Sequence, residues 1–397
     1  MAANAVFLGR VVVASLYALP GDVAALGRAA AIMPYIADAY APDPSVQAGH
    51  LLDSQGRAEE ALRYYYASLA HDPHAQPVWL LVASAEERAG RYDRAEHAYQ
   101  QAVERAPNQP ETYWMRANYL LRRGRTQESL AQFRELLRRT RAYDAIVFET
   151  AWRLEEPAAV ERDLLAAGGP ADLPYLRFAI ERADAAASRR AWVRMQARLP
   201  EIRPEEINAY SRLLAGAADY EAAWQAWRHW AHARGEGAGG LVRDGGFERG
   251  PLAGPFDWTF HSGAALHAFR DTSVAHSQAA SAQVLFLGTE NFEGAALEQW
   301  VRLAPHQWYR LSFVWRARDL SSDRAPAVQV WELGSHARLL CSVETSAGTS
   351  PWQRESVRFR VGEIPLMRIA VVRSASRKLD PVIRGSFWLD DVEIAAQ

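Results

Sequence analysis

The spacing in this chain closest to a chemical motif is a run of glycines near its middle. Gly235, Gly237 and Gly240 match the G-x-G-x-x-G pattern that binds dinucleotides. That pattern requires a preceding strand and a following helix, because the helix N-terminus receives the pyrophosphate. Here a helical pattern precedes the glycines and alternating strand patterns follow. We therefore interpret residues 235–240 as a flexible linker and predict no dinucleotide cofactor.

Other spacings typical of catalysis are missing from the sequence. It contains no H-E-x-x-H, no G-x-S-x-G and no Walker-type phosphate loop. Cys341 is the only cysteine, which excludes a disulfide framework and a cysteine-based zinc site. Neighbouring acids such as Glu59–Glu60 lie on predicted helices and are typical of solvated faces. We predict that the protein is not an enzyme.

The first part of the chain shows an internal repeat of 34 residues. Its signature is a small residue, an aromatic residue four positions on, a small residue and then a proline. The copies are Ala61, Tyr65, Ser68 and Pro73, then Ala95, Tyr99, Ala102 and Pro107, then the weaker Ser129, Phe133, Leu136 and Arg141. Gly56, Gly90 and Gly124 mark the turn inside each helix pair.

The front of the chain resembles the tetratricopeptide repeat superfamily, and we predict an α-solenoid over residues 1–234. Residues 3–40 are expected to form one or two opening helix pairs. Beyond Arg141 the repeat fades but the helical period continues, and Trp224, Trp227 and Trp230 are placed to close the last apolar face. The further helices are expected at 143–155, 158–167, 173–184, 186–198, 204–216 and 219–234.

After the linker the pattern changes to short alternating runs separated by Gly, Pro, Ser and Asp. Eight or nine strands without a helical period indicate an antiparallel β-sandwich over residues 241–397. The runs lie at 281–287, 296–303, 308–316, 327–332, 338–344, 354–361, 366–373 and 385–394.

Composition limits the partners. The 397 residues carry a formal net charge of −2, which gives no field for nucleic acid or anionic lipid. Lys378 is the only lysine, an imbalance that we attribute to GC-rich codons. The apolar run 11–19 is too short to span a membrane and lacks the basic start of a signal peptide. The compartment stays open: periplasm or cell envelope if a leader is missing, cytoplasm otherwise.

Four motifs in the second half give a second resemblance. They are Leu241–Glu248 (LVRDGGFE), Asp271–Ser277 (DTSVAHS), Gln299–Phe313 and Phe387–Ile394 (FWLDDVEI). Together they resemble jelly-roll carbohydrate-binding modules of the galactose-binding-like superfamily. The combination of a repeat solenoid with such a module resembles bacterial tetratricopeptide proteins associated with the envelope and with exopolysaccharide assembly.

The resemblance to these modules implies a structural calcium joining the first and last strands. The matching acidic positions are Glu248, Asp271 and one of Asp390 and Asp391, since neighbours in a strand face opposite ways. We favour Asp391. The alternative is that these acids are solvated groups at strand ends.

The same resemblance implies sugar binding on aromatic faces. Trp258, Trp331 and Trp352 lie in or beside predicted loops, and Trp308 begins a strand. Each is a candidate platform, and the alternative for each is a place in the core of the sandwich.

Three functions follow from these patterns. The first is a non-enzymatic adaptor whose solenoid groove, lined by Trp79, Glu86, Trp114 and Asn118, binds a protein partner while the sandwich binds a polysaccharide. Its expected setting is the bacterial envelope or exopolysaccharide assembly. The second is a structural scaffold whose sandwich caps the solenoid and binds no ligand. The third is an unrecognised carbohydrate-active enzyme with two convergent carboxylates.

Overall fold

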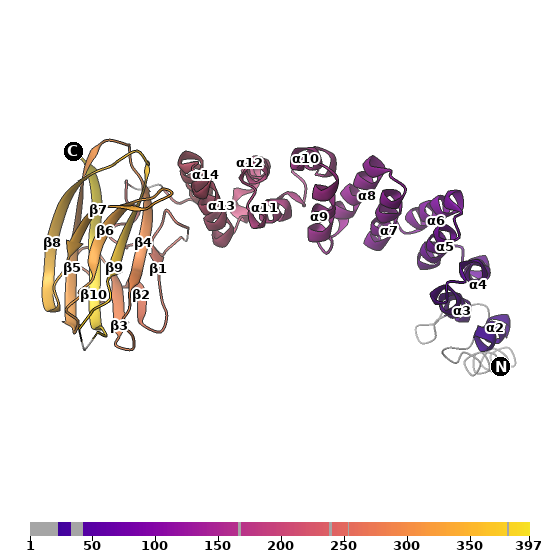
Figure 1. Cartoon of the computed structure of the whole chain (residues 1–397), viewed down its shortest axis with the longest axis horizontal. Helices are drawn as coiled ribbons and strands as arrows, with labels where there is room; N and C mark the ends of the chain where they lie inside the picture. The colour runs from indigo at the N-terminus through magenta and orange to yellow at the C-terminus, as the bar shows by residue number, and fades with distance from the viewer. Residues whose placement is uncertain (1–22, 33–42, 166–167, 238–239, 253, 379–380) are drawn as a thin grey trace. The chain divides into compact units, whose positions relative to one another are not determined.

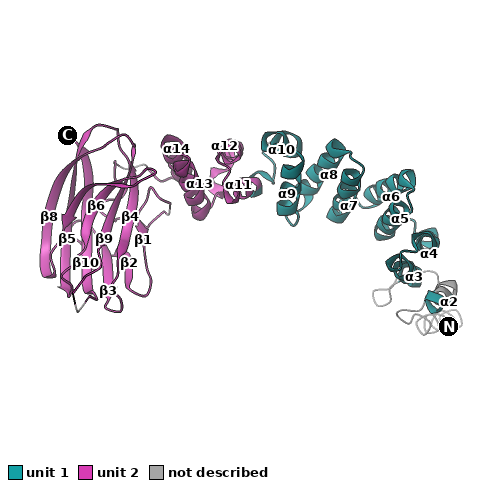
Figure 2. Cartoon of the chain, in the orientation of Figure 1, with its two compact units in different colours: residues 1–174 teal, residues 175–397 magenta. Residues whose placement is uncertain are grey.

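A computed structural model describes residues 23–32, 43–165, 168–237, 240–252, 254–378 and 381–397. The chain divides into two compact units, residues 1–174 and residues 175–397 (Figure 2). The apolar run 11–19 and most of the predicted opening pairs lie outside the described residues. The first unit is helical, and the second contains the last helices and all the strands (Figure 1).

The helices of the first unit follow one another as antiparallel pairs joined by short turns, as expected for a solenoid. The helix bounds are α2 (Val23–Ile32), α3 (Pro44–Ser54), α4 (Ala58–His71), α5 (Gln76–Arg88), α6 (Tyr92–Arg105), α7 (Pro110–Arg122), α8 (Thr126–Arg139), α9 (Asp144–Leu154), α10 (Pro157–Leu164) and α11 (Asp172–Glu181), which crosses into the second unit.

The three turn glycines adopt the conformation that the repeat predicts. Gly56, Gly90 and Gly124 have φ angles of +76°, +74° and +72°, a left-handed conformation that glycine adopts without a steric penalty. The residue after each glycine donates its main-chain N–H five positions back, as in Arg57 to Leu52 at 3.0 Å. These bonds satisfy helix-end carbonyls and turn the chain back on itself.

Small residues let the paired helices approach closely. Gly49, Ala83 and Ala117 occupy equivalent repeat positions, and a Cβ atom at Gly49 would overlap the Tyr65 ring. Tyr65 is fully buried, as is Phe133 two repeats on. Gly49 therefore packs directly against the Tyr65 ring.

In the second unit, four helical elements follow α11 and precede the strands. They are α12 (Ala185–Arg194), the 3₁₀ helix η1 (Gln196–Glu201), α13 (Pro204–Gly216) and α14 (Tyr220–Ala233). Pro204 at the first turn of α13 and Asp219, whose side chain accepts from the main-chain N–H of Ala222, fix the starts of the last two helices.

The strands form two antiparallel five-stranded sheets, in the orders β1-β4-β9-β6-β7 and β2-β3-β10-β5-β8. The strand bounds are β1 (Thr259–Phe260), β2 (Leu266–Asp271), β3 (Ser281–Leu287), β4 (Gly294–Arg302), β5 (Trp308–Leu320), β6 (Ala327–Glu332), β7 (Arg338–Glu344), β8 (Gly348–Arg360), β9 (Leu366–Arg373) and β10 (Arg384–Ala396).

Alternation along the strands fills the space between the two sheets. On β5, for example, Leu311, Phe313 and Trp315 belong to the core, and the residues between them face outward. The predicted class, a helical solenoid followed by an antiparallel sandwich, is confirmed. Asp271 is the last residue of β2.

The change from helix to strand falls between Ala233 and Thr259, as the sequence predicts. The compact units, however, divide at Pro174, so the last helices group with the sandwich. The predicted boundaries at 234 and 240 mark the change from helix to strand. The last helices belong to the same compact unit as the sandwich because α14 contacts it.

Candidate binding surfaces

A hollow of about 550 Å³ opens on the first unit beside α5 and α7. Glu87 is its one acidic lining residue, and this carboxylate accepts two hydrogen bonds from Arg122, at 2.7 and 2.8 Å. The guanidinium of Arg123 lies 3.7 Å from the centre of the Tyr92 ring. The full lining is Ser84, Glu87, Arg88, Tyr92, Arg122 and Arg123.

A second hollow of about 270 Å³ shares Ser84 and Arg122 with the first. Trp114 and Asn118, two of the predicted groove residues, line it together with Tyr99 and Met115. Asn118 is oriented by a hydrogen bond from its amide to the carbonyl of Trp114 at 2.8 Å. The two hollows share lining residues on α5 and α7, and α6 adds Tyr92 and Tyr99; together we call them the α5–α7 groove.

Two predicted groove residues do not line these hollows. Glu86 is fully buried, where it pairs with Arg91 and accepts a hydrogen bond from Tyr66 at 2.8 Å. Burial, with the hydrogen bond to Glu86, raises the pKa of Tyr66 to about 12. Trp79 donates from Nε1 to the Pro73 carbonyl at 2.9 Å, and Arg105 covers its ring.

The repeat explains this difference. Ser84 and Arg88 lie 34 residues before Asn118 and Arg122, so four lining residues come from two equivalent positions. Glu86 is equivalent to the buried Leu120 instead. Because a helix turns by about 100° per residue, an offset of two positions moves a side chain from the groove into the core.

In the second unit, one outer face of the sandwich is covered by helices. Phe256 is 1% exposed and lies against Trp224 and Trp227 of α14, with ring centres 5.1 and 5.8 Å apart. It also meets Trp300 of β4 edge-on at 5.8 Å, and Arg212 of α13 lies over the Trp300 ring. We call this outer side of sheet β1-β4-β9-β6-β7 the covered face.

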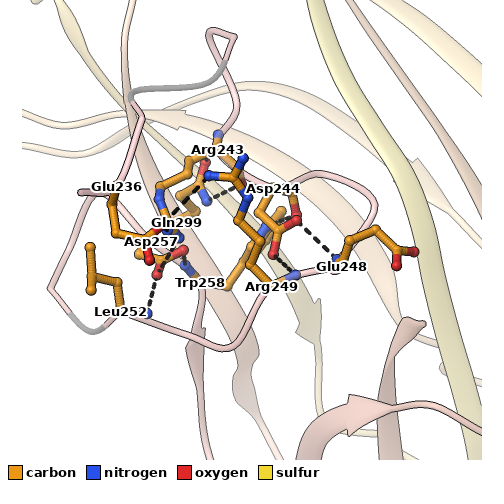
Figure 3. Close-up of polar contacts among 9 residues, drawn as sticks. All are labelled: Glu236, Arg243, Asp244, Glu248, Arg249, Leu252, Asp257, Trp258 and Gln299. Atoms are coloured by element: carbon orange, nitrogen blue, oxygen red, sulfur yellow. Dashed lines mark hydrogen bonds and ion pairs between the residues drawn. The ribbon is translucent and has the colours of Figure 1, made fainter. Parts of the chain in front are cut away.

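A buried ion pair holds the start of the sandwich beside this cluster (Figure 3). Arg243 and Asp257 are 4% and 1% exposed and lie 2.6 Å apart, and Glu236, just after α14, pairs with Arg243 at 3.0 Å. Gln299 binds the main chain of Arg243 at both N–H and carbonyl. Burial raises the pKa of Asp257, and the neighbouring Arg243 opposes that shift.

The motif residues beside Arg243 form a turn. Asp244 accepts from the main-chain N–H groups of Glu248 and Arg249 at 2.9 and 3.0 Å, and its carbonyl accepts from Trp258 Nε1 at 3.1 Å (Figure 3). Glu236 lies just before residues 238–239, which are outside the described residues, and Arg243 lies just after them. The ion pair between Glu236 and Arg243 therefore links the segment after α14 to the start of the sandwich.

The opposite outer side belongs to sheet β2-β3-β10-β5-β8, and we call it the open face. Trp308, the first residue of β5, is 47% exposed there, and Arg358 of β8 lies over its ring at 5.4 Å. Trp352, further along the β5–β8 pair, is half-buried and meets the His276 ring edge-on at 5.6 Å. An exposed indole face is a surface on which a sugar ring can stack.

Of the predicted sugar platforms, Trp258 is corrected by the structure. It is 3% exposed and packs on Phe247 at 4.9 Å inside the sandwich, so it offers no face to a ligand. Trp331 is half-buried on the outer side of β6, where Gln329 and Arg368 contact it. On the open face Trp308 is exposed and Trp352 is half-buried, whereas Trp388 is buried beneath Arg316 and Arg318.

The predicted calcium ligands all hold one loop, residues 272–280 between β2 and β3. Glu248 accepts from the N–H of Ala279 at 3.0 Å, Asp271 from that of Ser273 at 2.7 Å, and Asp391 from the His276 ring at 2.8 Å. Asp390 also binds this loop, at the N–H groups of His276 and Ser277.

Each of these carboxylates accepts hydrogen bonds from the loop. Among the described residues, no group of three or more His, Cys, Asp or Glu side chains is arranged to hold a metal ion. The calcium stays a prediction.

Burial raises the pKa of Asp271, but hydrogen bonds from Ser273 and Trp388 outweigh the effect of burial, so this pKa lies below its ordinary value.

Comparison with known proteins identifies the repeat. The family model for the tetratricopeptide repeat matches residues 54–118, which contain α4, α5 and α6 and most of α7. The search of curated proteins found no match. No helix among the described residues is long and apolar enough to cross a membrane.

Solved structures resemble each half separately. A TmCBM61 structure in complex with β-1,4-galactotriose has 20% identity and a TM-score of 0.28, covering 40% of this chain and 99% of that one. The family 22 carbohydrate-binding module of Clostridium thermocellum Xyn10B has 14% identity and a TM-score of 0.29, covering 40% and 93%. MamA from Desulfovibrio magneticus RS-1 has 16% identity and a TM-score of 0.26, covering 33% and 71%. Similarity at this level defines no ligand.

Proposed function

We propose that this protein is a non-enzymatic adaptor. The α5–α7 groove binds a protein partner, and the open face of the sandwich binds a polysaccharide. The setting we propose is polysaccharide assembly or export in a bacterial envelope, which rests on the resemblance of the repeat–sandwich combination described above. The observation that carries the glycan half is the exposed indole of Trp308 on the open face.

The helical half supports a protein-binding role through its geometry. First helices of successive repeats line one groove, and an extended or helical segment is the kind of ligand that such a surface fits. Trp114 and Met115 supply apolar contact area, and Ser84 and Asn118 supply hydrogen-bonding groups. Aromatic side chains surrounded by polar groups are typical of interaction surfaces.

The sandwich supports a glycan-binding role through the difference between its faces. Trp300 on the covered face lies against Phe256 and Arg212. On the open face, the guanidinium of Arg358 lies over the Trp308 ring. Among the described residues this is the one aromatic or cation–π contact of that ring. A ligand ring can therefore displace or share that contact.

The experiment is affinity electrophoresis of the full chain through gels that contain bacterial or plant polysaccharides. Trp308→Ala is the test variant and Trp331→Ala is the matched control, because both remove a partly exposed indole but from opposite sheets. Retardation that Trp308→Ala abolishes and Trp331→Ala preserves supports the proposal. A folded protein that no polysaccharide retards contradicts it.

A structural scaffold is the second candidate, and the covered face favours it. Phe256, Trp224 and Trp227 join the sandwich to the last helix, so the sandwich covers the end of the helical series. Capping uses one face only and leaves the open face available. Capping becomes the whole function of the sandwich if the glycan experiment fails.

The structural calcium has its own test. Thermal unfolding of the full chain with added calcium and with a chelator measures whether the ion binds the folded state, because such an ion raises Tm. A calcium-dependent rise that Glu248→Gln removes supports Glu248 as a ligand. An unchanged Tm contradicts the calcium prediction and leaves the hydrogen bonds of Glu248 to the loop as its role.

A further inference from the structure

Arginines gather on the open face at the pair of strands β5 and β8. Side chains alternate between the two faces along each strand, and several outward positions on both strands are arginine. The set is Arg310, Arg316 and Arg318 on β5 with Arg354, Arg358 and Arg360 on β8. Arg316 is half-buried and the other five are exposed.

Strand register places like charges directly opposite each other. Arg310 faces Arg358 across the antiparallel pair. Like charges at such positions repel and destabilise a sheet. Arg316 and Arg318 both lie over the Trp388 ring, at 5.6 and 5.4 Å, so they too are held near each other.

Few carboxylates balance these charges. On the same face Asp391 lies 3.8 Å from Arg354, and Glu393 of β10 is exposed opposite Ser312. No ion pair with Arg310 or Arg358 occurs among the described residues. Many arginines elsewhere are paired at short range, as in Arg57–Glu60, Arg125–Glu128 and Arg338–Glu332.

We propose that the open face binds an anionic polysaccharide, one with carboxylate groups along its chain. The inference rests on the proposed function and names the class of glycan. A guanidinium group binds a carboxylate through two parallel hydrogen bonds. Each of these bonds is stronger than one between neutral groups, because donor and acceptor carry opposite charges. A ligand carboxylate between Arg310 and Arg358 would replace their mutual repulsion with attraction.

The aromatic residues favour a polymer of sugars over a small anion. Trp308 lies at one end of the β5–β8 pair, opposite Arg360, and Trp352 lies towards the other end, beyond Gln353. Arg310, Arg354 and Arg358 occupy outward positions between them, together with Ser312 and Ser356. Such a row fits an extended chain that stacks rings at its ends and carries charge along its length.

The experiment compares two forms of one polymer on the full chain. Isothermal titration with polygalacturonate and with its methyl ester keeps the sugar and removes the charge. We expect polygalacturonate to bind about tenfold more tightly at low salt, as one charge-assisted contact contributes. The difference should shrink as salt screens the exposed arginines.

The test variant is Arg310→Gln with Arg358→Gln. It should weaken polygalacturonate binding about tenfold and change methyl-ester binding much less, although Arg358 also lies over the Trp308 ring. The control is Arg63→Gln with Arg94→Gln, which removes two exposed arginines from α4 and α6. If the double variant does not fold, the single variant Arg310→Gln replaces it.

Each outcome decides between the proposals. Equal affinity for the two polymers, or a variant that binds polygalacturonate normally, overturns the anionic preference and leaves glycan binding intact. Failure of both polymers to bind, with the polysaccharide gels also negative, contradicts the proposed function itself. Arginine-dependent binding of duplex DNA without polygalacturonate binding overturns the inference and assigns the face to nucleic acid.

Discussion

The two outer faces of the sandwich use the same residue types for different ends. On the covered face, Trp300 and Arg302 contact helices: Trp300 meets Phe256, and Arg302 pairs with Glu221 of α14 at 2.5 Å. On the open face, Trp308 and Arg310 hold the same alternating positions two residues apart on a strand, yet they stay exposed. A tryptophan and an arginine two residues apart on a strand therefore indicate an interface. The contacts of these side chains show whether another part of the chain already occupies it.

The largest expected effect separates the two faces by stability. Phe256→Ala removes a buried ring between α14 and β4 and should lower the free energy of unfolding by about 3–5 kcal/mol. Its control is Phe269→Ala on the open side of β2, where the ring is 40% exposed, with an expected change within about 0.5 kcal/mol. Urea denaturation measures both. Equal losses would remove the distinction between the faces.

The next effect tests the support of the open face and depends on pH. Asp271→Asn weakens the bonds from Trp388 and Ser273 and should cost about 1–3 kcal/mol at pH 7. Because the folded-state pKa of Asp271 is lowered, its contribution is complete above the unfolded pKa and disappears as pH falls below about 4.

Thermal unfolding from pH 7 to pH 3 measures this effect. The gap between the wild-type protein and Asp271→Asn should narrow towards the acidic end, whereas Asp93→Asn, which changes an exposed acid on α6, should follow the wild type throughout. A gap between Asp271→Asn and wild type that stays constant with pH would show that the charge of Asp271 has no role.

A smaller effect concerns the ion pair of the covered face. Arg302 and Glu221 are about half exposed, so Arg302→Gln should cost between about 0 and 1 kcal/mol, and less at high salt. Denaturation in low and high salt measures the change. A loss above about 2 kcal/mol would mean that this pair, and not the aromatic cluster, joins α14 to the sandwich.

The smallest expected effect is a gain. Arg310→Gln removes one of two like charges that face each other on the open face, and it should raise the free energy of unfolding by about 0.2–1 kcal/mol. Arg63→Gln on α4 should give no gain. If Arg310→Gln is more stable and also binds polygalacturonate less tightly, the wild-type Arg310 lowers stability and contributes to binding. A destabilised one would mean that Arg310 makes a structural contact.

Local patterns predicted most of the fold. The glycines at 56, 90 and 124 and the paired Ala and Tyr positions identify each repeat, because turn conformation and close helix packing depend on residues near in sequence. Alternation located most of the strands, with 281–287, 327–332, 338–344 and 366–373 at the observed bounds. The predicted runs did not include β1 and β2.

The binding surfaces were harder to predict because they depend on contacts between distant segments. Trp258 becomes a core residue through Phe247, and Glu86 becomes buried through Tyr66 and Arg91. Neither contact has a local signal. The arginine row of β5 and β8 is visible in the sequence only once the register of the two strands is known.

The cluster around Phe256 also bears on how such a chain can be rearranged by recombination. Phe256 belongs to the sandwich by sequence and to α14 by contact, and Glu236 continues the attachment through Arg243. A sandwich transferred to another protein from residue 241 would carry Phe256 and Trp300 without their cover. We expect an exchangeable cassette to begin near residue 175, where the compact units divide, and to carry its last helices with it.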